Sequence, residues 1–315
     1  MKKIILIVSA ILGFSCAINA QSFDEKGASI ALAVVMEDFP QPFPDMAKVQ
    51  LTNKLNQLLT KNGVASAEAL DRFFITVVAT PTDKDIVPGP PTQISQKMEM
   101  TFYIADYYDK KIYSTAVANT IGVGTNETRS YMDAIKHINV NTPAMETFVG
   151  EGKKKIVAYY DSQAGRIIKE AKSCLKQKRY EEAFFKLGSI PSECEKYDEA
   201  IELGNSVYQE YIDYQCDQNL AKAKSEWMAA QNAEGATRVG EYLSQIYPDA
   251  KCYGDAQKLY MEVKGKVMDD WKYEMKQYQD GVDIEKAKVN AWKEVGVAYG
   301  KGQQPTTTNL TWLGR

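Results

Sequence analysis

The sequence has little of what common catalytic and metal sites need. Its 315 residues include one histidine, His137, and five cysteines, none of which forms a C-x-x-C pair or a cluster with the histidine. The sequence therefore argues against zinc sites of the usual Cys/His type, and Ser-His-Asp or Cys-His mechanisms are weakly supported. His137 falls on the polar side of a predicted helix near its end, which indicates a solvated or capping side chain. We expect no cofactor, no metal and no catalytic residue.

Long basic clusters and long apolar runs are also missing. The formal net charge is −3, and no basic stretch is interleaved with aromatic residues, so nucleic acid is a poor partner. After the first residues, no apolar run is long enough to be a membrane helix. With 44% hydrophobic and 25% charged residues, the composition is that of a globular protein.

The amino-terminal segment predicts export. A basic start and a short apolar run over 4–14, followed by small residues up to Ala20, predict a signal peptide over residues 1–20. Lipidation at Cys16 is the alternative, although the residues before it fit a lipoprotein signal poorly. Removal of this segment takes away two lysines and no acid, so the net charge of −3 becomes −5. We expect a periplasmic or outer-membrane-associated protein, with peripheral membrane attachment left open.

The remaining chain divides into two parts with different periodicity. Residues 21–142 mix alternating apolar stretches with helical ones, whereas strand signals are missing over 143–300, and 301–315 form a polar tail. About 295 residues exceed one typical domain. The sequence therefore predicts an α+β fold, with a small mixed α/β domain followed by an all-α domain.

The first part predicts the order strand, helix, strand, strand, strand, helix. Its clearest signal is the alternation of Met98, Met100, Phe102 and Ile104 with polar residues, which indicates a strand with one apolar face. A segment with four prolines and a glycine is predicted to be a loop. The predicted strands are 30–35, 73–79, 93–106 and 112–121, the helices follow Pro44 and Gly124, and the loop is 80–93.

A hairpin turn at Asp109 and Lys110, the strand that follows and the segment GVGTNETRSYMDAIKHI resemble a known type of domain. They are similar to the compact α/β domain of bacterial envelope accessory proteins: the curli-secretion lipoprotein, the amino-terminal domain of TolB, and lipoproteins that activate penicillin-binding proteins. The resemblance is one of topology and implies no functional residue. Channel assembly like that of the curli-secretion protein would need a long amphipathic β-hairpin, and these strand lengths predict a short one.

The second part resembles tetratricopeptide repeats. In AGRIIKEAKSCLKQKRYEEAFFKLGSIP, Ala171 lies where two helices would cross, and Tyr180 and Ala183 follow the turn. The triplet AKS recurs at 223–225, a spacing of 52 that exceeds the ~34 residues of the standard repeat. We attribute the excess to an inserted helix over 195–213. The resemblance implies stacked helical hairpins with a concave protein-binding surface.

The end of this part predicts a long helical hairpin. Apolar residues from Leu259 to Val282 step by three or four along one predicted ridge. After Gly281, the small residues Ala287, Ala291 and Ala298 predict a second helix suited to close packing.

Four cysteines follow the predicted signal peptide, and they allow three pairings. A helix over 195–213 would hold Cys194 about 33 Å from Cys216, too far for the ~7 Å that a disulfide spans between α-carbons. The next hairpin returns Cys252 to the level of Cys216, so the sequence predicts a Cys216–Cys252 disulfide. Cys174 is expected to be buried as a small apolar residue, and Cys194 is left unassigned.

Tyrosine is abundant, with 19 residues that include the pairs 107–108 and 159–160. Because Tyr and Trp are effective anchors at protein interfaces, they are candidates for partner contacts. Ordinary packing with the hydroxyl in water is the alternative. The candidate interaction aromatics are Tyr208, Tyr211, Tyr214 and Trp227.

These features favour a non-catalytic scaffolding or interaction protein of the cell envelope, with another envelope protein or assembly as its partner. The alternative is a secreted glycan- or cell-wall-active enzyme, or a ligand-binding protein, that uses the cleft between the two parts. That alternative requires ionisable groups with shifted pKa values to converge in the cleft.

Overall fold

The computed structural model describes residues 30–36, 44–66, 72–267, 271–277, 283–303 and Leu313. The predicted signal peptide, the alternative lipidation at Cys16 and most of the polar tail lie outside these residues. Within the described part of the chain, no helix combines the length and the apolar character needed to cross a membrane.

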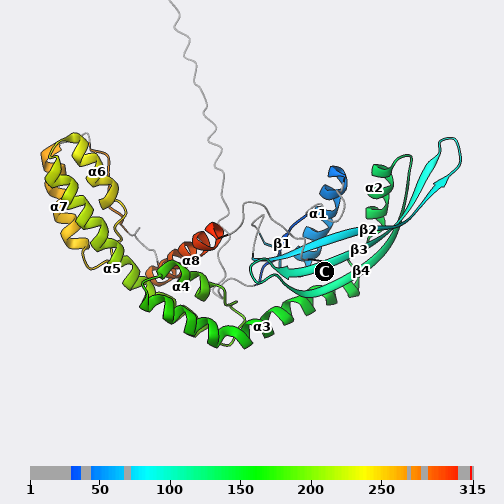
Figure 1. The fold of residues 1–315 in the computed structure, drawn as a ribbon, viewed down its shortest axis with the longest axis horizontal. Helices are drawn as coiled ribbons and strands as arrows, with labels where there is room; N and C mark the ends of the chain where they lie inside the picture. The colour runs from blue at the N-terminus through cyan, green and yellow to red at the C-terminus, as the bar shows by residue number, and fades with distance from the viewer. Residues whose placement is uncertain are drawn as a thin grey trace, which may run out of the picture.

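The molecule is an arch in which one long helix, α3, joins a sheet at one end to a group of helices at the other (Figure 1). This arrangement confirms the predicted α+β fold with an all-α carboxyl-terminal part. The elements are β1 (Ala33–Val34), α1 (Asp45–Lys61), β2 (Phe73–Val87), β3 (Gln93–Asp106), β4 (Lys111–Gly124), α2 (Glu127–His137), α3 (Pro143–Lys176), α4 (Tyr180–Gly188), α5 (Tyr197–Ala229), α6 (Ala233–Leu243), α7 (Tyr253–Val267) and α8 (Ile284–Gly302).

The sheet has the order β1-β2-β3-β4, with β1 parallel to β2 and the other pairs antiparallel. The predicted order of elements is correct, but the predicted loop over 80–93 is wrong. β2 and β3 stay paired out to Val87 and Gln93, so only 88–92 form the turn. Pro81 is tolerated because the register shifts between Pro81 and Asp83, where a missing N–H donor costs least.

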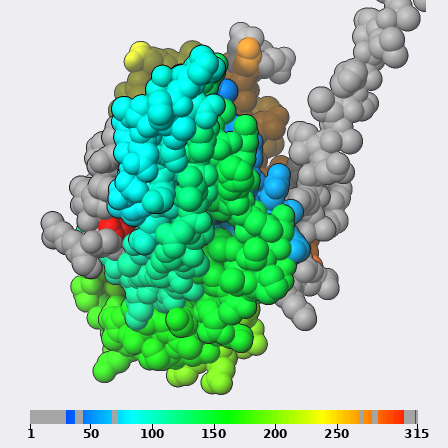
Figure 2. All heavy atoms as spheres, turned by 90° about the vertical axis from the view of Figure 1, so that its right-hand side faces the viewer, coloured from blue at the N-terminus to red at the C-terminus, as the bar shows by residue number. Residues whose placement is uncertain are grey.

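The β2–β3 hairpin therefore protrudes as a longer element than the sequence predicted. Figure 2 shows its atoms, in cyan, forming the surface at this end of the molecule. Near its tip the side chain of Ile86 is 71% exposed. The hairpin considered for channel assembly, 93–106 with 112–121, corresponds instead to β3 and β4, which have nearly the predicted lengths.

Helices α1, α2 and α3 cover one face of the sheet. Met98, Met100, Phe102 and Ile104 are buried against them, as the alternation predicted. Helix α2 approaches β4 so closely that a Cβ at Gly122 would lie 1.9 Å from the Ser130 carbonyl oxygen. A glycine at this position is therefore required by packing.

On the opposite face of the sheet, one residue of the predicted tail is buried. Leu313 packs with Ala33, Phe74 and Ala105, which are neighbours across β1, β2 and β3. The tail thus returns to the sheet at this residue.

Helix α3 belongs to both parts of the chain. It begins at the predicted boundary, where the Thr142 side chain caps it by accepting a hydrogen bond from the Met145 N–H. Its first half packs on the sheet, with Gly152 against Ile104, and its second half packs on α4. The buried residues of the two parts form one continuous cluster.

The inserted helix expected over 195–213 is not a separate element. It continues into the next predicted helix, so that α5 is a single helix of 33 residues. Helices α6 and α7 pack along its second half. Helical periodicity cannot distinguish one long helix from two collinear ones when no proline or cap separates them.

The predicted long terminal hairpin is wrong. Helix α7 ends at Val267, residues 271–277 are not helical, and α8 packs mainly on α4 and α5. The buried ridge of α8 also differs from the predicted alanines. It consists of Trp292, Gly296 and Gly300.

Trp292 holds α8 in place. It is fully buried, its ring stacks on Phe184 at 5.8 Å, and its Nε1 donates to Asn205 Oδ1 at 3.0 Å. We expect Trp292→Ala to lower the free energy of unfolding by about 3–5 kcal/mol, because it leaves a large cavity. Urea unfolding measures this loss. Val297→Ala, on the exposed side of the same helix, is the control, and an equal loss in both variants would contradict the assignment.

Candidate functional site

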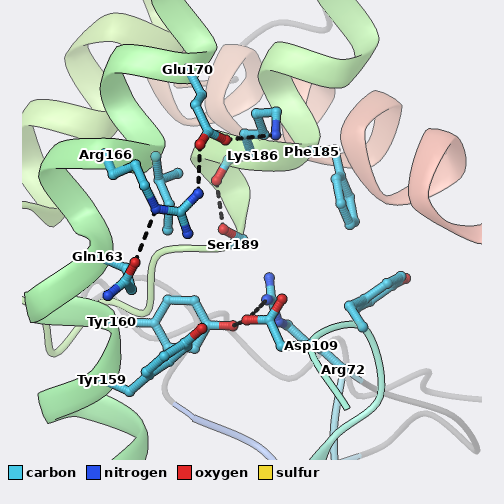
Figure 3. Close-up of a pocket in the computed structure, with 12 residues that line it drawn as sticks. Arg72, Asp109, Tyr159, Tyr160, Gln163, Arg166, Glu170, Phe185, Lys186 and Ser189 are labelled. Atoms are coloured by element: carbon cyan, nitrogen blue, oxygen red, sulfur yellow. Dashed lines mark hydrogen bonds and ion pairs between the residues drawn. The ribbon is translucent and has the colours of Figure 1, made fainter. Parts of the chain in front are cut away.

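A pocket of about 150 Å³ lies at the junction of the sheet, α3 and α4 (Figure 3). It occupies the cleft between the two parts of the chain that the sequence analysis treated as the alternative site. Its lining residues come from the start of β2, the β3–β4 turn, α3 and the segment from α4 to Ser189: Arg72, Tyr108, Asp109, Tyr159, Tyr160, Gln163, Arg166, Ile167, Glu170, Phe185, Lys186 and Ser189.

The floor of the pocket rests on a buried carboxylate, Asp106, which has no solvent exposure. Its Oδ2 accepts from Arg72 Nε at 3.0 Å and from the Tyr160 hydroxyl at 2.6 Å. Its Oδ1 accepts from the backbone N–H groups of Tyr108 at 2.8 Å and Asp109 at 3.1 Å. Both oxygens are therefore satisfied, which is the condition for a stable buried charge.

Arg72 links this carboxylate to the pocket itself. Its Nη2 lies 3.4 Å from Asp109 Oδ2, and its guanidinium carbon lies 4.8 Å from the centre of the Tyr160 ring and 5.5 Å from that of Tyr108. The guanidinium thus combines ion pairs with contacts to aromatic faces. These contacts fix the position of the β3–β4 turn against α3.

A second network crosses from α3 to α4. Arg166 Nε donates to Gln163 Oε1 at 3.0 Å, and its Nη1 donates to Glu170 Oε1 at 2.5 Å. The other oxygen of Glu170 accepts from Lys186 Nζ at 2.9 Å. Residues three and four positions apart share one helix face, which places these α3 side chains together. Glu170 then joins the two helices.

Aromatic rings form the walls. Tyr108 packs edge-on against Phe185 at 5.0 Å, and Tyr159 packs against Tyr160 at 5.2 Å. Lys111 Nζ lies 3.8 Å from the centre of the Tyr159 ring. Tyr108 from one of the tyrosine pairs noted in the sequence and both members of the other pair, Tyr159 and Tyr160, therefore contribute to one site.

Among the lining residues, each resolved shift moves the pKa further from 7. Burial raises the pKa of Tyr160 strongly, and Asp106 adds to the rise although Arg72 opposes it. Burial, and then Asp109, raises the pKa of Tyr159. Burial alone would lower the pKa of Arg72, but its acidic neighbours raise it above the usual value.

The shift of Glu170 follows the same rule. The hydrogen bond from Lys186 lowers its pKa by more than burial raises it, and Arg166 adds to the lowering. At neutral pH these tyrosines are neutral, Arg72 is positive and Glu170 is negative.

The four predicted interaction aromatics lie on α5, away from this pocket, and two of them are core residues. Tyr208 is 2% exposed and Trp227 is 3% exposed, so these two do not lie on an exposed face as expected. Tyr211 is half-buried and Tyr214 is 38% exposed. Because other helices pack against α5 on several sides, its large aromatic side chains are buried between helices instead of facing solvent.

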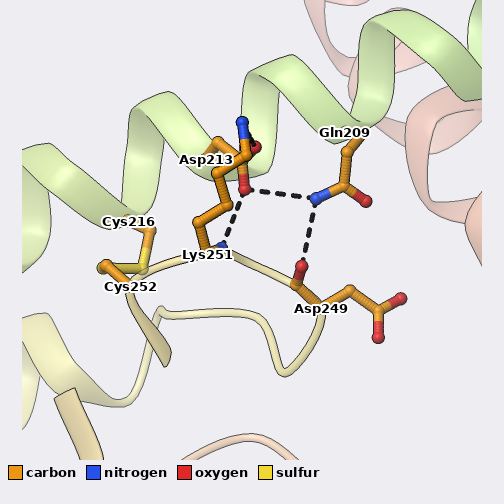
Figure 4. Close-up of a disulfide and its surroundings, with 6 residues drawn as sticks. All are labelled: Gln209, Asp213, Cys216, Asp249, Lys251 and Cys252. Atoms are coloured by element: carbon orange, nitrogen blue, oxygen red, sulfur yellow. Dashed lines mark hydrogen bonds and ion pairs between the residues drawn. A yellow bond between two sulfur atoms is a disulfide. The ribbon is translucent and has the colours of Figure 1, made fainter. Parts of the chain in front are cut away.

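The predicted Cys216–Cys252 disulfide is present, with the two α-carbons 6.0 Å apart (Figure 4). Beside it, Asp213 accepts from the Lys251 backbone N–H at 2.9 Å and pairs with Lys251 Nζ at 2.8 Å. Gln209 bridges Asp213 and the Asp249 carbonyl. The bond and these contacts tie the start of α7 to the middle of α5.

The other two cysteines are free and buried. Cys174 packs in the core as expected. Burial, and then Asp161, raises the pKa of Cys194 to about 12. Its thiol is therefore protonated and unreactive at neutral pH.

His137 is mostly exposed and lies 3.9 Å from Asp133. In the part of the chain that the structure describes, no three or more His, Cys, Asp or Glu side chains are grouped to hold a metal ion.

Sequence reasoning missed the charged residues of the pocket. Only the i, i+4 spacing of Arg166 and Glu170 was a local signal, and it is common on helix surfaces. Arg72 and Asp106 meet across paired strands, and Lys186 reaches Glu170 from another helix. None of these contacts leaves a periodic pattern in the sequence.

No known protein family and no curated protein matches this chain. Among solved structures, a minor lipoprotein from Acinetobacter baumannii is similar over 41% of this chain and 94% of its own, with 18% identity and a TM-score of 0.23. A protein of Caulobacter crescentus CB15 assigned as a lipoprotein is similar over 40% of this chain and 83% of its own, with 10% identity and a TM-score of 0.21. At such low scores these likenesses carry no weight for what this chain does.

Proposed function

We propose that this chain is an exported protein of the bacterial cell envelope that binds another envelope protein and catalyses no reaction. The observation that carries this proposal is the pairing of charges in the junction pocket. Arg72 is paired with Asp106 and Asp109, while Arg166 and Lys186 are paired with Glu170.

This pairing suits recognition better than acid–base chemistry. A general acid or base works best with a pKa near the operating pH. The shifts in this pocket instead move the pKa values of Arg72, Tyr160 and Glu170 further from neutral pH. The pocket, at about 150 Å³, is also smaller than the roughly 300–1,000 Å³ of small-molecule sites. It has room for one side chain or chain end of a partner.

Two sequence features support the location. The segment 1–20 is predicted to direct export. The Cys216–Cys252 disulfide fits an oxidising compartment, because such bonds rarely persist in the cytosol.

The helical half fits a binding module of the tetratricopeptide type in its first hairpin. Ala171 and Ala183 are buried where α3 and α4 cross, as that repeat requires. The uninterrupted α5 departs from the repeat length, so the likeness applies to α3 and α4.

Site-specific photocrosslinking in cells tests the proposal. A photoreactive residue at Ser189, on the pocket lining, is expected to give a discrete adduct with one envelope protein. The same residue at Met228, which is exposed on the distal half of α5, is the control and is expected to give no such adduct. The same adduct from both positions, or none from Ser189, would contradict protein docking at this pocket.

A second candidate is binding or processing of glycan or cell-wall material. It is favoured by the position of Asp109 and Glu170 beside tyrosine rings in the cleft between the two parts. A wall fragment whose affinity depends on Asp109, in the absence of any protein adduct at Ser189, would favour this candidate over the first.

A further inference from the structure

We infer that the junction pocket recognises a carboxylate group and that Arg166 receives it. This inference rests on the proposed function, in which the pocket is a binding site, and it names the chemistry of the group that enters. The argument starts from the geometry of one side chain.

Arg166 is exposed on α3 yet held in a fixed orientation. Gln163 binds its Nε and Glu170 binds its Nη1, on opposite edges of the guanidinium group. Figure 3 shows the other terminal nitrogen pointing toward Tyr160. Within the described residues, no hydrogen bond uses the N–H groups of that nitrogen, so they remain available to a ligand. The N–H groups of this one nitrogen, held in a fixed direction, can donate charge-assisted hydrogen bonds to a carboxylate.

The charge balance of the pocket favours an anion. The positive side chains in or beside it are Arg72, Lys111, Arg166 and Lys186, against the carboxylates of Asp106, Asp109 and Glu170.

One more carboxylate, that of Glu182, lies 3.9 Å from Lys186. Arg179 pairs with Glu182 at 2.5 Å, so these two charges cancel and the net charge around the pocket is unchanged. The local excess is positive, whereas the whole chain carries −3. Asp106 is also fully occupied by Arg72, Tyr160 and two backbone N–H groups. It therefore repels an incoming anion less than a free carboxylate would.

The walls limit what can carry the carboxylate. Tyr108, Tyr159 and Phe185 present apolar surface on two sides, and the volume of about 150 Å³ accepts one ring or one short side chain. The ligand class is therefore a carboxylate attached to a compact apolar group. A free carboxylic acid and the carboxyl terminus of a partner chain both have this chemistry.

Benzoate and its neutral analogue benzamide are suitable probes for the full-length protein, with binding followed by NMR titration. We expect benzoate to bind in the millimolar range and benzamide to bind at least about tenfold more weakly, since one charge-assisted contact is lost. Arg166→Gln is expected to weaken benzoate binding by about tenfold or more. The matched control is Arg238→Gln, because Arg238 on α6 is also held by two side chains, in its case Glu226 and Glu234, far from the pocket.

Equal binding of benzoate and benzamide, no binding of benzoate, or unchanged binding by Arg166→Gln would each overturn the inference. Arg166→Lys separates charge from geometry. Lysine keeps the charge but loses the fixed guanidinium orientation that Gln163 and Glu170 provide, so affinity is expected to fall between those of the wild type and Arg166→Gln. Thermal unfolding of each variant checks that the fold is intact.

A second set of probes distinguishes the two sources. Short peptides that end in phenylalanine are titrated with a free or an amidated carboxyl terminus. Selective binding of the free acid supports both the inference and protein docking. If benzoate binds through Arg166 and neither peptide does, carboxylate recognition stands and the proposed docking of a chain end at this pocket fails.

Discussion

Arg72→Met is expected to lower the free energy of unfolding by about 3–5 kcal/mol, the usual cost of leaving one partner of a buried ion pair uncompensated. The side chain of Asp106 is fully buried and that of Arg72 is only 15% exposed. Methionine fills much of the same space but supplies neither the charge nor the two donors to Asp106 and Asp109. Urea unfolding followed by circular dichroism measures the loss.

The double variant Arg72→Met/Asp106→Asn tests whether the loss comes from charge. Asparagine retains an oxygen that can accept from the Tyr108 and Asp109 N–H groups, so the pair of substitutions removes both charges and keeps these contacts. We expect the double variant to be more stable than Arg72→Met alone. Arg238→Met, on an exposed ion pair, is the control and is expected to change stability little. A double variant no more stable than Arg72→Met would show that the uncompensated charge of Asp106 is not the cause of the loss.

Loss of the Cys216–Cys252 disulfide has a comparable expected effect. The two cysteines are 36 residues apart, and in the loop-entropy model a closed loop of this length stabilises by about 3–4 kcal/mol. Cys216→Ser/Cys252→Ser is therefore expected to lower the unfolding temperature by several degrees. The loss should appear first in α5, α6 and α7, which the bond ties together.

Reduction of the wild type provides the matched comparison. With a reductant present, the wild type is expected to unfold at the temperature of the double serine variant, and the variant is expected to be insensitive to the reductant. Peptide mass spectrometry without reduction reports the bond itself. Thiol titration confirms that the reductant has opened the bond. If the wild type is then as stable as before reduction, the bond does not stabilise the fold.

Elements with strong local patterns could be predicted from the sequence. Period-two alternation predicted the face of β3 that carries Phe102 and Ile104. Helical periodicity predicted the buried leucines of α1, although Met46 and Val49, which belong to the same apolar pattern, are exposed. The Cys216–Cys252 pairing was also predictable, because a hairpin of two helices returns Cys252 to the level of Cys216.

The misjudged segments share a physical cause. Much of the proline-rich stretch over 80–93 pairs as strand because β2 accommodates Pro81 with an extra residue before Asp83. Helix α8 leaves the predicted hairpin because Trp292 finds a site between α4 and α5, where Gly204 allows the ring to approach. In both cases a contact with a distant segment outweighs the local preference.

The sequence alone determined the fold class, the main strands and helices of the first part, and the disulfide. Each of these depends on residues that are close in the chain or are brought together by one helical hairpin. Sequence periodicity and the distance that a disulfide can span are therefore enough to define them. Only the tertiary structure decided which charged and aromatic side chains meet in the junction pocket. Arg72 and Tyr160 converge on Asp106 because α3 packs along the sheet, and long-range packing of this kind leaves no periodic trace in the order of the residues.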